Sequence, residues 1–447
     1  MTGIKEKIGY GLGDMSSSMF WKLSSIYLPI LYGEIFKLDI VTIGTLMLVT
    51  RIWDAVSDPI MGLIADRTDT RWGKYRPYLL WGAIPYAIFG VLMFTNPGLA
   101  YRTPWAYITY ILMMTSYTLI NVPYSAMMGV ASIYSAEKTE FASFRMAFAY
   151  LGSFAVLYAW EPLCNHLGGF RGEYAETGWR NAMIVVSAVS VLLFLSSFLL
   201  TREKFKPTHS DTIWGDLSQL KSNIPWWILS GLSLCTNLFN TFRAVTVIYF
   251  FRYFVQESAN GLYSIFILCG EIANVLGITL LTVPLTKRFG KKKVFIACGV
   301  AMAVLSIVFF FMPATHTGVS GMFAIQILIS ILTGIISPMV WSMYADLSDY
   351  TSAKTGTGAI GLIFSTASMS QKLGGAIAGT LVMWLLAGFG LNPDISQQSG
   401  SAILGLKLCM SFYPAGIAII MALGAIIYPL DTATMDDVHK QLKANYQ

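Results

Sequence analysis

Charge is scarce in this sequence. Lys, Arg, Asp and Glu make up 12% of its 447 residues, whereas the hydrophobic types reach 55%. A soluble domain carries about 25% charged residues, so this chain has too little polar surface for a water-soluble globule. One very large soluble core is also excluded, because soluble cores divide into domains beyond about 250–300 residues. The composition therefore predicts a protein embedded in a membrane.

Cysteine is sparse too, with five residues and no CxxC spacing. The cysteines are scattered, mostly in apolar runs, so we expect small apolar side chains in a helix bundle rather than metal ligands. The N-terminus shows no short apolar core followed by a cleavage site. Its first apolar run contains Asp14 and Lys22, which predicts a retained helix. The net charge of +6 is spread over short segments between apolar runs, so no nucleic-acid partner is expected.

Long apolar runs recur along the whole chain. Each is close in length to the about 20 residues that a helix needs to cross a bilayer. We predict an all-α integral membrane protein with about twelve transmembrane helices, with boundaries good to about ±2–4 residues. The predicted helices span residues 10–32, 40–65, 78–95, 104–132, 141–164, 179–201, 225–251, 260–286, 293–312, 319–343, 356–388 and 401–430.

The basic residues of the loops are unevenly divided between the two sides of the predicted bundle. When loops are assigned alternately, most Lys and Arg fall on the side of the N-terminus. The few on the opposite side are Lys37, Arg102, Arg171, Arg180 and Arg252. Because basic loops stay in the cytoplasm, we predict a plasma (inner) membrane protein with both termini cytoplasmic.

The chain divides in the middle. A polar stretch at 201–223 separates six predicted helices from six others. The loop after the second helix, GLIADRTDTRWGKYRP, and the loop after the eighth, VPLTKRFGKKKVF, both carry basic residues and a glycine. We therefore predict an N-terminal six-helix half at 1–201, a cytoplasmic middle loop at 202–224 and a C-terminal six-helix half with a cytoplasmic tail at 225–447. This arrangement is typical of the major facilitator fold.

Several ionisable residues lie inside the predicted helices. Such a residue costs about 2.5–3.5 kcal/mol at the bilayer centre on insertion scales, so it usually faces a cavity or a partner. These residues are Asp14, Arg51, Asp54, Asp58, Arg145, Arg243 and Lys372.

Asp54 and Asp58 are spaced i,i+4 and share one face of the second helix. Two carboxylates at one level repel each other, and a bound proton or monovalent cation relieves that repulsion. Carboxylate oxygens are also the ligands that hard metal ions prefer. Asp54 and Asp58 are therefore metal ligands if the ion is Na⁺ or Li⁺, and proton carriers if it is H⁺. The alternative is a structural ion pair between Arg51 and one of the two acids.

Asp14 follows two glycines, Gly11 and Gly13, which allow a ligand or another helix to approach closely. Together with Arg145 and Lys372 it could recognise a polyol, because carboxylates accept and cations donate hydrogen bonds to hydroxyl groups. The alternative is that these charges only neutralise one another, with Lys372 as a counter-ion to Asp54 or Asp58.

Aromatic and amide side chains offer a second set of sugar contacts. Tyr117, Asn121 and Tyr124 share one face of the fourth helix, and a tyrosine beside an amide can stack on a sugar and hydrogen-bond to it. Trp341 is a weaker candidate. Arg243 could face the cavity or extend toward an interface, and the sequence leaves its role open.

The motifs RIWDAVSDPIMGLIADRTDTRWGKYRPY, YGLGD and ADLSDYTSAKTG resemble those of the glycoside–pentoside–hexuronide:cation symporter family of major facilitators, which includes the melibiose carrier. The resemblance covers nearly the whole chain. It implies a secondary active transporter that imports a sugar with a cation by alternating access. It also implies no enzyme activity and no cofactor beyond the coupling cation, H⁺ or Na⁺.

The resemblance also implies a role for individual residues. Asp54, Asp58 and Thr118 match the cation site, and Asp14 and Arg145 match the sugar-binding acid and base. Lys372 matches a lysine that links the two sites. We further expect a small sugar or glycoside and a monovalent cation as ligands, membrane lipid as surroundings, and a monomer.

Two positions depart from the melibiose carrier, which has an acid at the position of Asn121 and a tryptophan at that of Ser125. Losing the acid weakens the expectation of a galactoside and of Na⁺, because fewer anionic oxygens compensate for stripping water from the ion. The sequence therefore favours H⁺ over Na⁺, although two acids and Thr118 could suffice for Na⁺.

Two other functions are compatible with parts of the sequence. A membrane-embedded prenyltransferase holds Mg²⁺ and a diphosphate with DxxxD pairs, for which Asp54 with Asp58 and Asp346 with Asp349 are candidates. A lipid flippase or sensor could use the same scaffold with a more apolar cavity. Magnesium-dependent diphosphate release would identify the enzyme.

Overall fold

The computed structural model describes residues 3–98, 100–170, 175–205, 215, 218, 220–256, 262–355, 359–392, 395 and 397–446. They form two compact units. The first comprises Met1–Asp216 with Thr351–Thr366, and the second comprises Leu217–Tyr350 with Ala367–Gln447. The predicted middle loop at 202–224 lies largely outside the described residues, as does Arg171, so the predicted division into halves stays a prediction.

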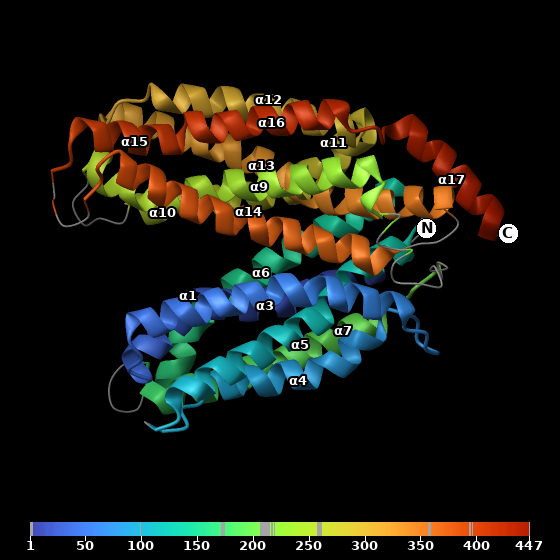
Figure 1. The fold of residues 1–447 in the computed structure, drawn as a ribbon, viewed down its shortest axis with the longest axis horizontal. Helices are drawn as coiled ribbons and strands as arrows, with labels where there is room; N and C mark the ends of the chain where they lie inside the picture. Colours follow the sequence, from blue (N-terminus) through green and yellow to red (C-terminus); the bar gives the residue numbers. More distant parts are fainter. Residues whose placement is uncertain are drawn as a thin grey trace. The chain divides into compact units, whose positions relative to one another are not determined.

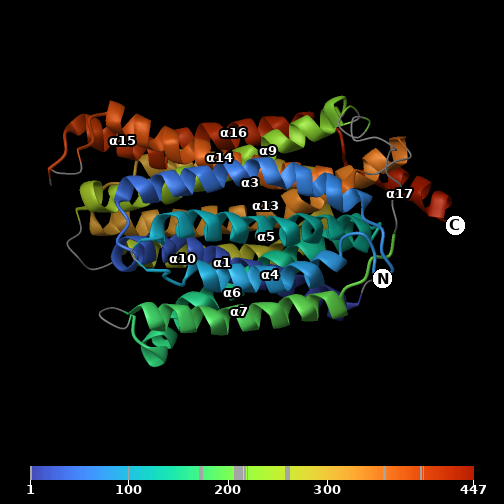
Figure 2. The same cartoon turned by 60° about the horizontal axis from the view of Figure 1, so that its bottom comes forward.

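The helices of the first unit run alongside one another (Figures 1 and 2). Helix α1 packs against α6 and α7, α4 packs against α5 and α7, and α3 packs against α5. The helices are α1 (Ile4–Ile26), α2 (Leu28–Ile30), η1 (Leu31–Ile35), α3 (Ile40–Arg67), α4 (Pro77–Met93), α5 (Arg102–Ala131), α6 (Ser135–Leu167) and α7 (Ala175–Leu200).

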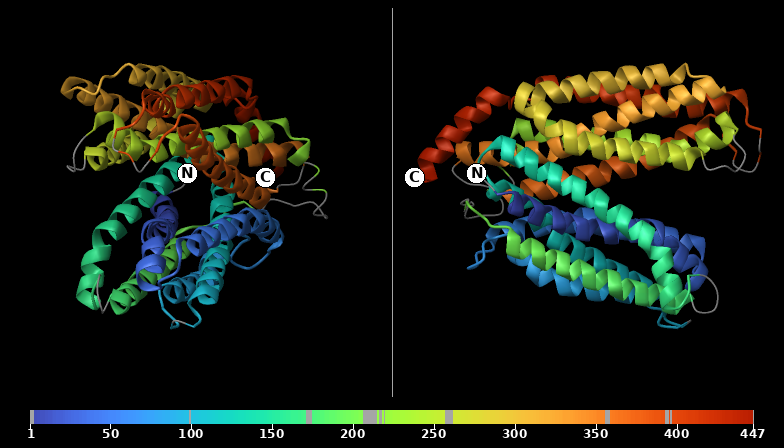
Figure 3. Two further views of the ribbon diagram at one scale, coloured as in Figure 1. Left: turned by 60° about the vertical axis from the view of Figure 1, so that its left-hand side comes forward. Right: turned by 180° about the vertical axis from the view of Figure 1, so that it is seen from behind.

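In the second unit α12 and α9 pack against α16, and α15 packs against α9. A terminal helix, α17, turns away from the direction of α16 (Figure 3). The remaining helices are α9 (Ile224–Phe250), η2 (Phe251–Val255), α10 (Leu262–Leu276), η3 (Gly277–Leu281), α11 (Thr282–Phe289), α12 (Lys291–Phe310), α13 (His316–Thr355), α14 (Ile360–Gly388), α15 (Gly400–Met410), α16 (Phe412–Ile427) and α17 (Thr432–Tyr446).

Local sequence signals set several helix ends. The Asp39 side chain accepts a hydrogen bond from the Thr42 amide at 2.9 Å and caps the start of α3. Ser399 caps α15 in the same way through the Ala402 amide. Both satisfy a backbone donor that the first helical turn leaves unpaired. Helix α6 ends at Leu167, and the glycine that caps it, Gly168, has a φ of 147° that disfavours other residues.

Helix occupies every predicted range, which confirms the all-α prediction, but several boundaries were wrong. Helix α1 begins at Ile4 and α13 continues to Thr355, because polar turns extend these helices beyond their apolar segments. The predicted helix 401–430 breaks at Ser411, whose φ and ψ of −130° and −82° are not helical. The predicted tail contains α17, which is amphipathic and buries Met435, Val438 and Leu442.

Hydropathy separates the helices into two kinds. Among the described residues, 6 helical spans are long and apolar enough to cross a membrane by length and composition alone. Helices α1, α3, α5, α9 and α14 are not among them. These helices carry most of the ionisable and amide residues singled out above, and polar residues lower mean hydropathy where they face the bundle interior. Apolar side chains cover outward faces instead, as Leu192 and Leu199 do at 63% and 70% exposure.

Candidate functional site

Two acids on α3 converge on one hydroxyl of α5. The Thr118 Oγ1 lies 3.0 Å from Asp58 Oδ1 and 3.5 Å from Asp54 Oδ1. Both carboxylates and the threonine are almost fully buried. The i,i+4 spacing places both acids on the face of α3 that meets α5. The three predicted cation-site residues thus lie together in the first unit.

This set of oxygens suits a small hard cation or a proton. Two buried carboxylates at one level repel each other, and a bound proton or monovalent cation relieves that repulsion. The part of the chain that the structure describes holds no group of three or more His, Cys, Asp or Glu side chains placed as metal ligands. A metal bound here would therefore use two carboxylates, the hydroxyl and further oxygens such as water.

Arg51 does not form the ion pair considered from the sequence. Within the described residues it contacts neither Asp54 nor Asp58 as an ion-pair partner. Its guanidinium lies instead over the ring of Trp21, 4.8 Å from the ring centroid. This cation–π contact leaves its N–H donors available to a ligand.

Asp14 and Arg145 form an ion pair, with 3.2 Å between Asp14 Oδ2 and Arg145 Nε and side-chain exposures of 11% and 4%. The guanidinium also lies 5.1 Å from the ring centroid of Tyr124. Tyr124 in turn stacks on Tyr10, and the hydroxyl of each donates to the backbone oxygen of the other. Tyr124 therefore orients Arg145 and joins α5 to α1, rather than offering a free hydroxyl.

Glycines bring the helices of this pair together. A side chain at Gly152 of α6 would place its Cβ 2.5 Å from the Met15 carbonyl oxygen. The two glycines before Asp14 act similarly, because Gly11 faces the Phe148 ring and Gly13 faces the Tyr124 ring. Close helix approach is thus the observed use of these glycines.

The amide of Asn121 has an unused acceptor. Its Oδ1 is buried and has no hydrogen-bond partner among the described residues, and the Ser125 hydroxyl one turn later shares this state. An unpaired buried polar atom costs about 1–3 kcal/mol, which a bound hydroxyl group would recover. Tyr117, one turn earlier, places its ring 5.7 Å from that of Trp21.

The other predicted residues belong to the second unit. Lys372 is half-buried on α14, and Trp341 is buried on α13. Arg243 donates to the Met410 carbonyl at 2.7 Å and to Gln326 Oε1 at 2.6 Å. It is therefore buried and bonded within its unit and does not extend toward an interface.

Sequence reasoning missed a polar cluster near the basic loop of the first unit. The buried carboxylate of Asp66 accepts hydrogen bonds from the amides of Gly361 and Leu362, and from the Tyr75 hydroxyl at 2.7 Å. Burial, reinforced by this carboxylate, raises the pKa of Tyr75 far above its usual value and keeps the hydroxyl a donor. The DRTDTRWGKYRP motif identified this region as part of the family resemblance. It did not indicate that Asp66 would bind the amides at the start of a helix.

Asp346 and Asp349, the second acidic pair of the prenyltransferase alternative, each face a basic residue. Asp346 Oδ2 lies 2.6 Å from Lys291 Nζ, and Asp349 Oδ2 lies 3.8 Å from His439 Nε2. The contact between Asp346 and Lys291 is that of a structural ion pair rather than of a diphosphate site.

Long apolar helices that bury an acid–hydroxyl cluster and an acid–guanidinium pair define a multi-pass membrane transporter. Residues 9–432 match the family described as MFS/sugar transport protein. The chain belongs to this family and to its glycoside–pentoside–hexuronide:cation symporter-like group.

Individual relatives agree with this assignment. YagG of Escherichia coli (strain K12), named as a candidate glycoside/cation symporter, is 34% identical over 443 residues, covering 98% of this chain and 95% of YagG. The isoprimeverose transporter of Lactiplantibacillus pentosus is 28% identical over 431 residues, covering 95% and 88%. The crystal structure of the E. coli fucose:proton symporter FucP shares the fold, with a TM-score of 0.68 and 14% identity over 94% of this chain and 98% of FucP.

The predicted class of function is confirmed. The protein is a secondary active sugar:cation symporter and not an enzyme. The major facilitator fold is likewise confirmed. Neither the prenyltransferase nor the flippase alternative is supported.

Proposed function

We propose that the first unit binds both ligands of the symporter. The cation binds Asp54, Asp58 and Thr118, and one sugar ring binds Asp14, Arg145, Asn121 and Tyr117. The convergence of two buried carboxylates on the single Thr118 hydroxyl carries this proposal. The unused Asn121 Oδ1 supports the sugar assignment.

The coupling ion in this proposal is H⁺. The chain has an amide at Asn121, so Asp54 and Asp58 are the only acids proposed to hold the ion. A proton requires one carboxylate, whereas Na⁺ requires several oxygens to replace its water shell.

Uptake into membrane vesicles tests the ion. Sugar accumulation should rise as external pH falls and should not respond to Na⁺ added at constant pH. A several-fold stimulation by millimolar Na⁺ would instead assign a metal ion to Asp54 and Asp58 and leave the sugar site standing.

The substrate in this proposal is a glycoside or short oligosaccharide. Relatives named for glycosides and for isoprimeverose support that class. A panel of xylosides, galactosides, glucuronides and isoprimeverose, each supplied with a proton gradient and with a Na⁺ gradient, would identify the sugar. Absence of gradient-driven uptake for every member would contradict the proposed class.

Lys372 is proposed to couple the two sites, as the family resemblance implies. Movement of the halves 1–201 and 225–447 would expose the proposed binding site to one side of the membrane at a time. Cation binding would neutralise the acids of α3 and so change which charges orient the sugar.

We place the protein in the plasma (inner) membrane as a lipid-embedded monomer with both termini cytoplasmic. The bias of basic loops supports this orientation. Protease added to sealed right-side-out vesicles should spare tags at both termini, and the mass of the purified protein should be that of one chain. Cleavage of either tag from outside would reverse the orientation.

A further inference from the structure

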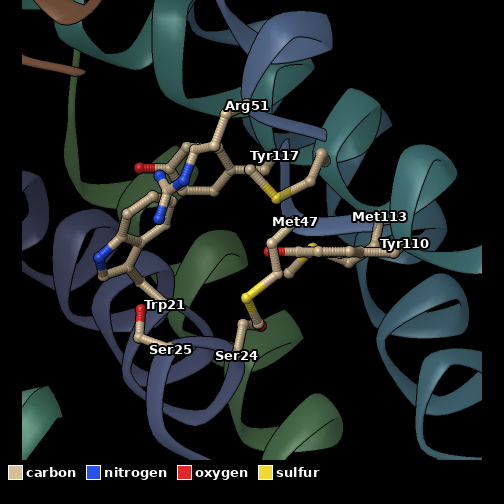
Figure 4. Close-up of a pocket in the computed structure, with 9 residues that line it drawn as sticks. Trp21, Ser24, Ser25, Met47, Arg51, Tyr110, Met113 and Tyr117 are labelled. Carbon is tan, nitrogen blue, oxygen red and sulfur yellow. The ribbon is translucent and has the colours of Figure 1, made fainter. Parts of the chain in front are cut away.

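A cavity in the first unit lies outside the residues assigned to either ligand, apart from Tyr117. Its volume is about 100 Å³. The side chains that face it come from α1, α3 and α5 (Figure 4). The lining residues used below are Trp21, Ser24, Met47, Arg51, Tyr110 and Tyr117.

The cavity residues lie on the same helix faces as residues of the proposed sugar and cation sites. Trp21 lies seven residues after Asp14 on α1, and Tyr110 lies seven before Tyr117 on α5. A seven-residue separation returns to the same helix face. Seven residues of helix span about 10 Å, which is close to the length of two linked pyranose rings.

The α3 face shows the same spacing. Met47 precedes Asp54 by seven residues, and Arg51 precedes Asp58 by seven. All three helices thus present one face that leads from the cavity to the site residues, and Tyr117 borders both.

Unsatisfied polar groups face this cavity. The Ser24 hydroxyl is buried and has no hydrogen-bond partner among the described residues. Arg51 is exposed, and its guanidinium lies against the Trp21 ring. One acceptor and several donors are therefore placed beside aromatic faces, a combination that suits the polar edges and apolar faces of a sugar ring.

Charge and size favour a neutral ring edge over an acidic group. Asp54 lies one turn from Arg51 on the same helix, and Asp58 follows one turn later. A carboxylate on the ligand would therefore be attracted by one guanidinium but repelled by two acids. The volume is about two thirds of a cavity that binds benzene. It therefore accommodates one edge of a sugar ring, with the remainder lying against the exposed Arg51.

We infer that this cavity is a second sugar subsite and that the transported ligand is a disaccharide or longer glycoside. One ring binds at Asp14 and Arg145, and the next ring places one edge in the cavity beside Trp21, Arg51 and Ser24. This inference rests on the proposed sugar site and adds the size of the ligand to it.

Ligand pairs that share one sugar but differ in length test the subsite. Equilibrium binding to the purified full-length protein would compare methyl β-D-xyloside with xylobiose, methyl α-D-xyloside with isoprimeverose, and methyl α-D-galactoside with melibiose. For the preferred sugar, the disaccharide should bind at least about tenfold more tightly than the methyl glycoside, a difference typical of one added ring contact.

Two substitutions should lower this preference. Trp21→Leu removes the aromatic face and Arg51→Gln removes the charged donor, and either should bring the ratio of the two affinities toward one. Trp21→Phe keeps an aromatic face and should keep most of the ratio. Trp81→Leu is the matched control, because Trp81 lies on α4 with 45% exposure and outside this cavity.

The outcomes separate this inference from the proposed function. If no glycoside of either length binds, the proposed sugar site itself is wrong. If glycosides bind but the wild-type ratio is near one, or if Trp21→Leu leaves a high ratio intact, the second subsite is wrong. A loss with Arg51→Gln that appears only for methyl glucuronide would also overturn it, because the cavity would then bind an acid.

Discussion

Asp58 and Asp54 lie at different distances from the Thr118 hydroxyl. The Thr118 Oγ1 lies 3.0 Å from Asp58 Oδ1 and 3.5 Å from Asp54 Oδ1, and only the first distance is within the usual range for a hydroxyl hydrogen bond. Both acids are buried at the same contact between α3 and α5. Removing the charge of one acid therefore changes how strongly the other acid binds a proton or cation. The two acids should therefore not be equivalent in coupling.

Asp58→Asn should abolish accumulation of sugar against its gradient while leaving sugar binding or exchange partly intact. The amide keeps the size of the side chain and cannot take up the proton or balance a cation. Uptake and counterflow in the same vesicles measure the two properties. Asp437→Asn, at an exposed position of α17, should change neither, and an Asp58→Asn protein that still concentrates sugar would remove Asp58 from coupling.

Asp14→Ala and Arg145→Ala should each weaken sugar binding about ten- to a hundredfold, because a hydrogen bond to a charged group contributes about 1.5–3 kcal/mol. Cation affinity should fall far less. Titration of each purified variant with sugar and with cation gives the comparison.

The buried pair also suggests a discriminating double variant. Removing one partner of a buried ion pair costs about 3–5 kcal/mol through the charge left behind. If Asp14 and Arg145 only neutralise each other, Asp14→Asn combined with Arg145→Gln should restore sugar binding. Direct sugar contacts would leave the double variant as weak as either single one.

Helices α1 and α6 approach closely at small residues, among them Gly152. Gly152→Leu would drive a side chain into the Met15 carbonyl, because the new Cβ would lie only 2.5 Å from that oxygen. Overpacking of this kind costs about 1–3 kcal/mol, and it would move Arg145 away from Asp14. We expect a lower melting temperature together with weaker sugar binding. Gly44→Leu on α3, where the space is open, should lower neither, and equal effects of the two would contradict this packing role.

The basic loop before α4 is held by one carboxylate. Glu203 accepts hydrogen bonds from the amides of Lys74, Tyr75 and Arg76 at 2.8, 2.8 and 2.7 Å. Three amides that converge on one acid order the loop as a clasp between α3 and α4. The loop is therefore fixed from a residue far along the chain.

Glu203→Ala should lower the free energy of unfolding by about 1–3 kcal/mol, since several charged hydrogen bonds are lost at once. Thermal unfolding in detergent, with protease cleavage within 68–76, measures the effect. Glu6→Gln is a suitable comparison, because Glu6 pairs with Lys204 in a part-exposed salt bridge of the kind worth about 0–1 kcal/mol. Similar losses for both variants would argue against the clasp.

Across the protein, coupling requires that each ligand change the affinity for the other by the same factor. We expect saturating cation to tighten sugar binding, and saturating sugar to tighten cation binding equally. Lys372→Gln should bring both factors toward one. Calorimetric titration in both orders provides the numbers, and an unchanged factor in the variant would separate Lys372 from coupling.

Much of this architecture was predictable from the apolar runs, because a chain that crosses a bilayer must pair its backbone polar groups internally, and long helices do so. The acids of α3 were also predictable, since charge is expensive inside a membrane and i,i+4 spacing fixes a shared face. The break at Ser411 and helix α17 were not, because both depend on tertiary contacts. Trp21 was missed for another reason: its register with Asp14 was visible, but a tryptophan in an apolar helix is ordinarily packing.

Arg243 is balanced in an unusual way. Its guanidinium binds the Met410 carbonyl, where α15 ends at the break before α16, and the end of a helix carries a partial negative charge. A peptide carbonyl does not gain or lose a proton at physiological pH, unlike a carboxylate partner. The charge balance at this contact therefore does not change with pH in the physiological range. If transport depends on pH, that dependence must come from other groups.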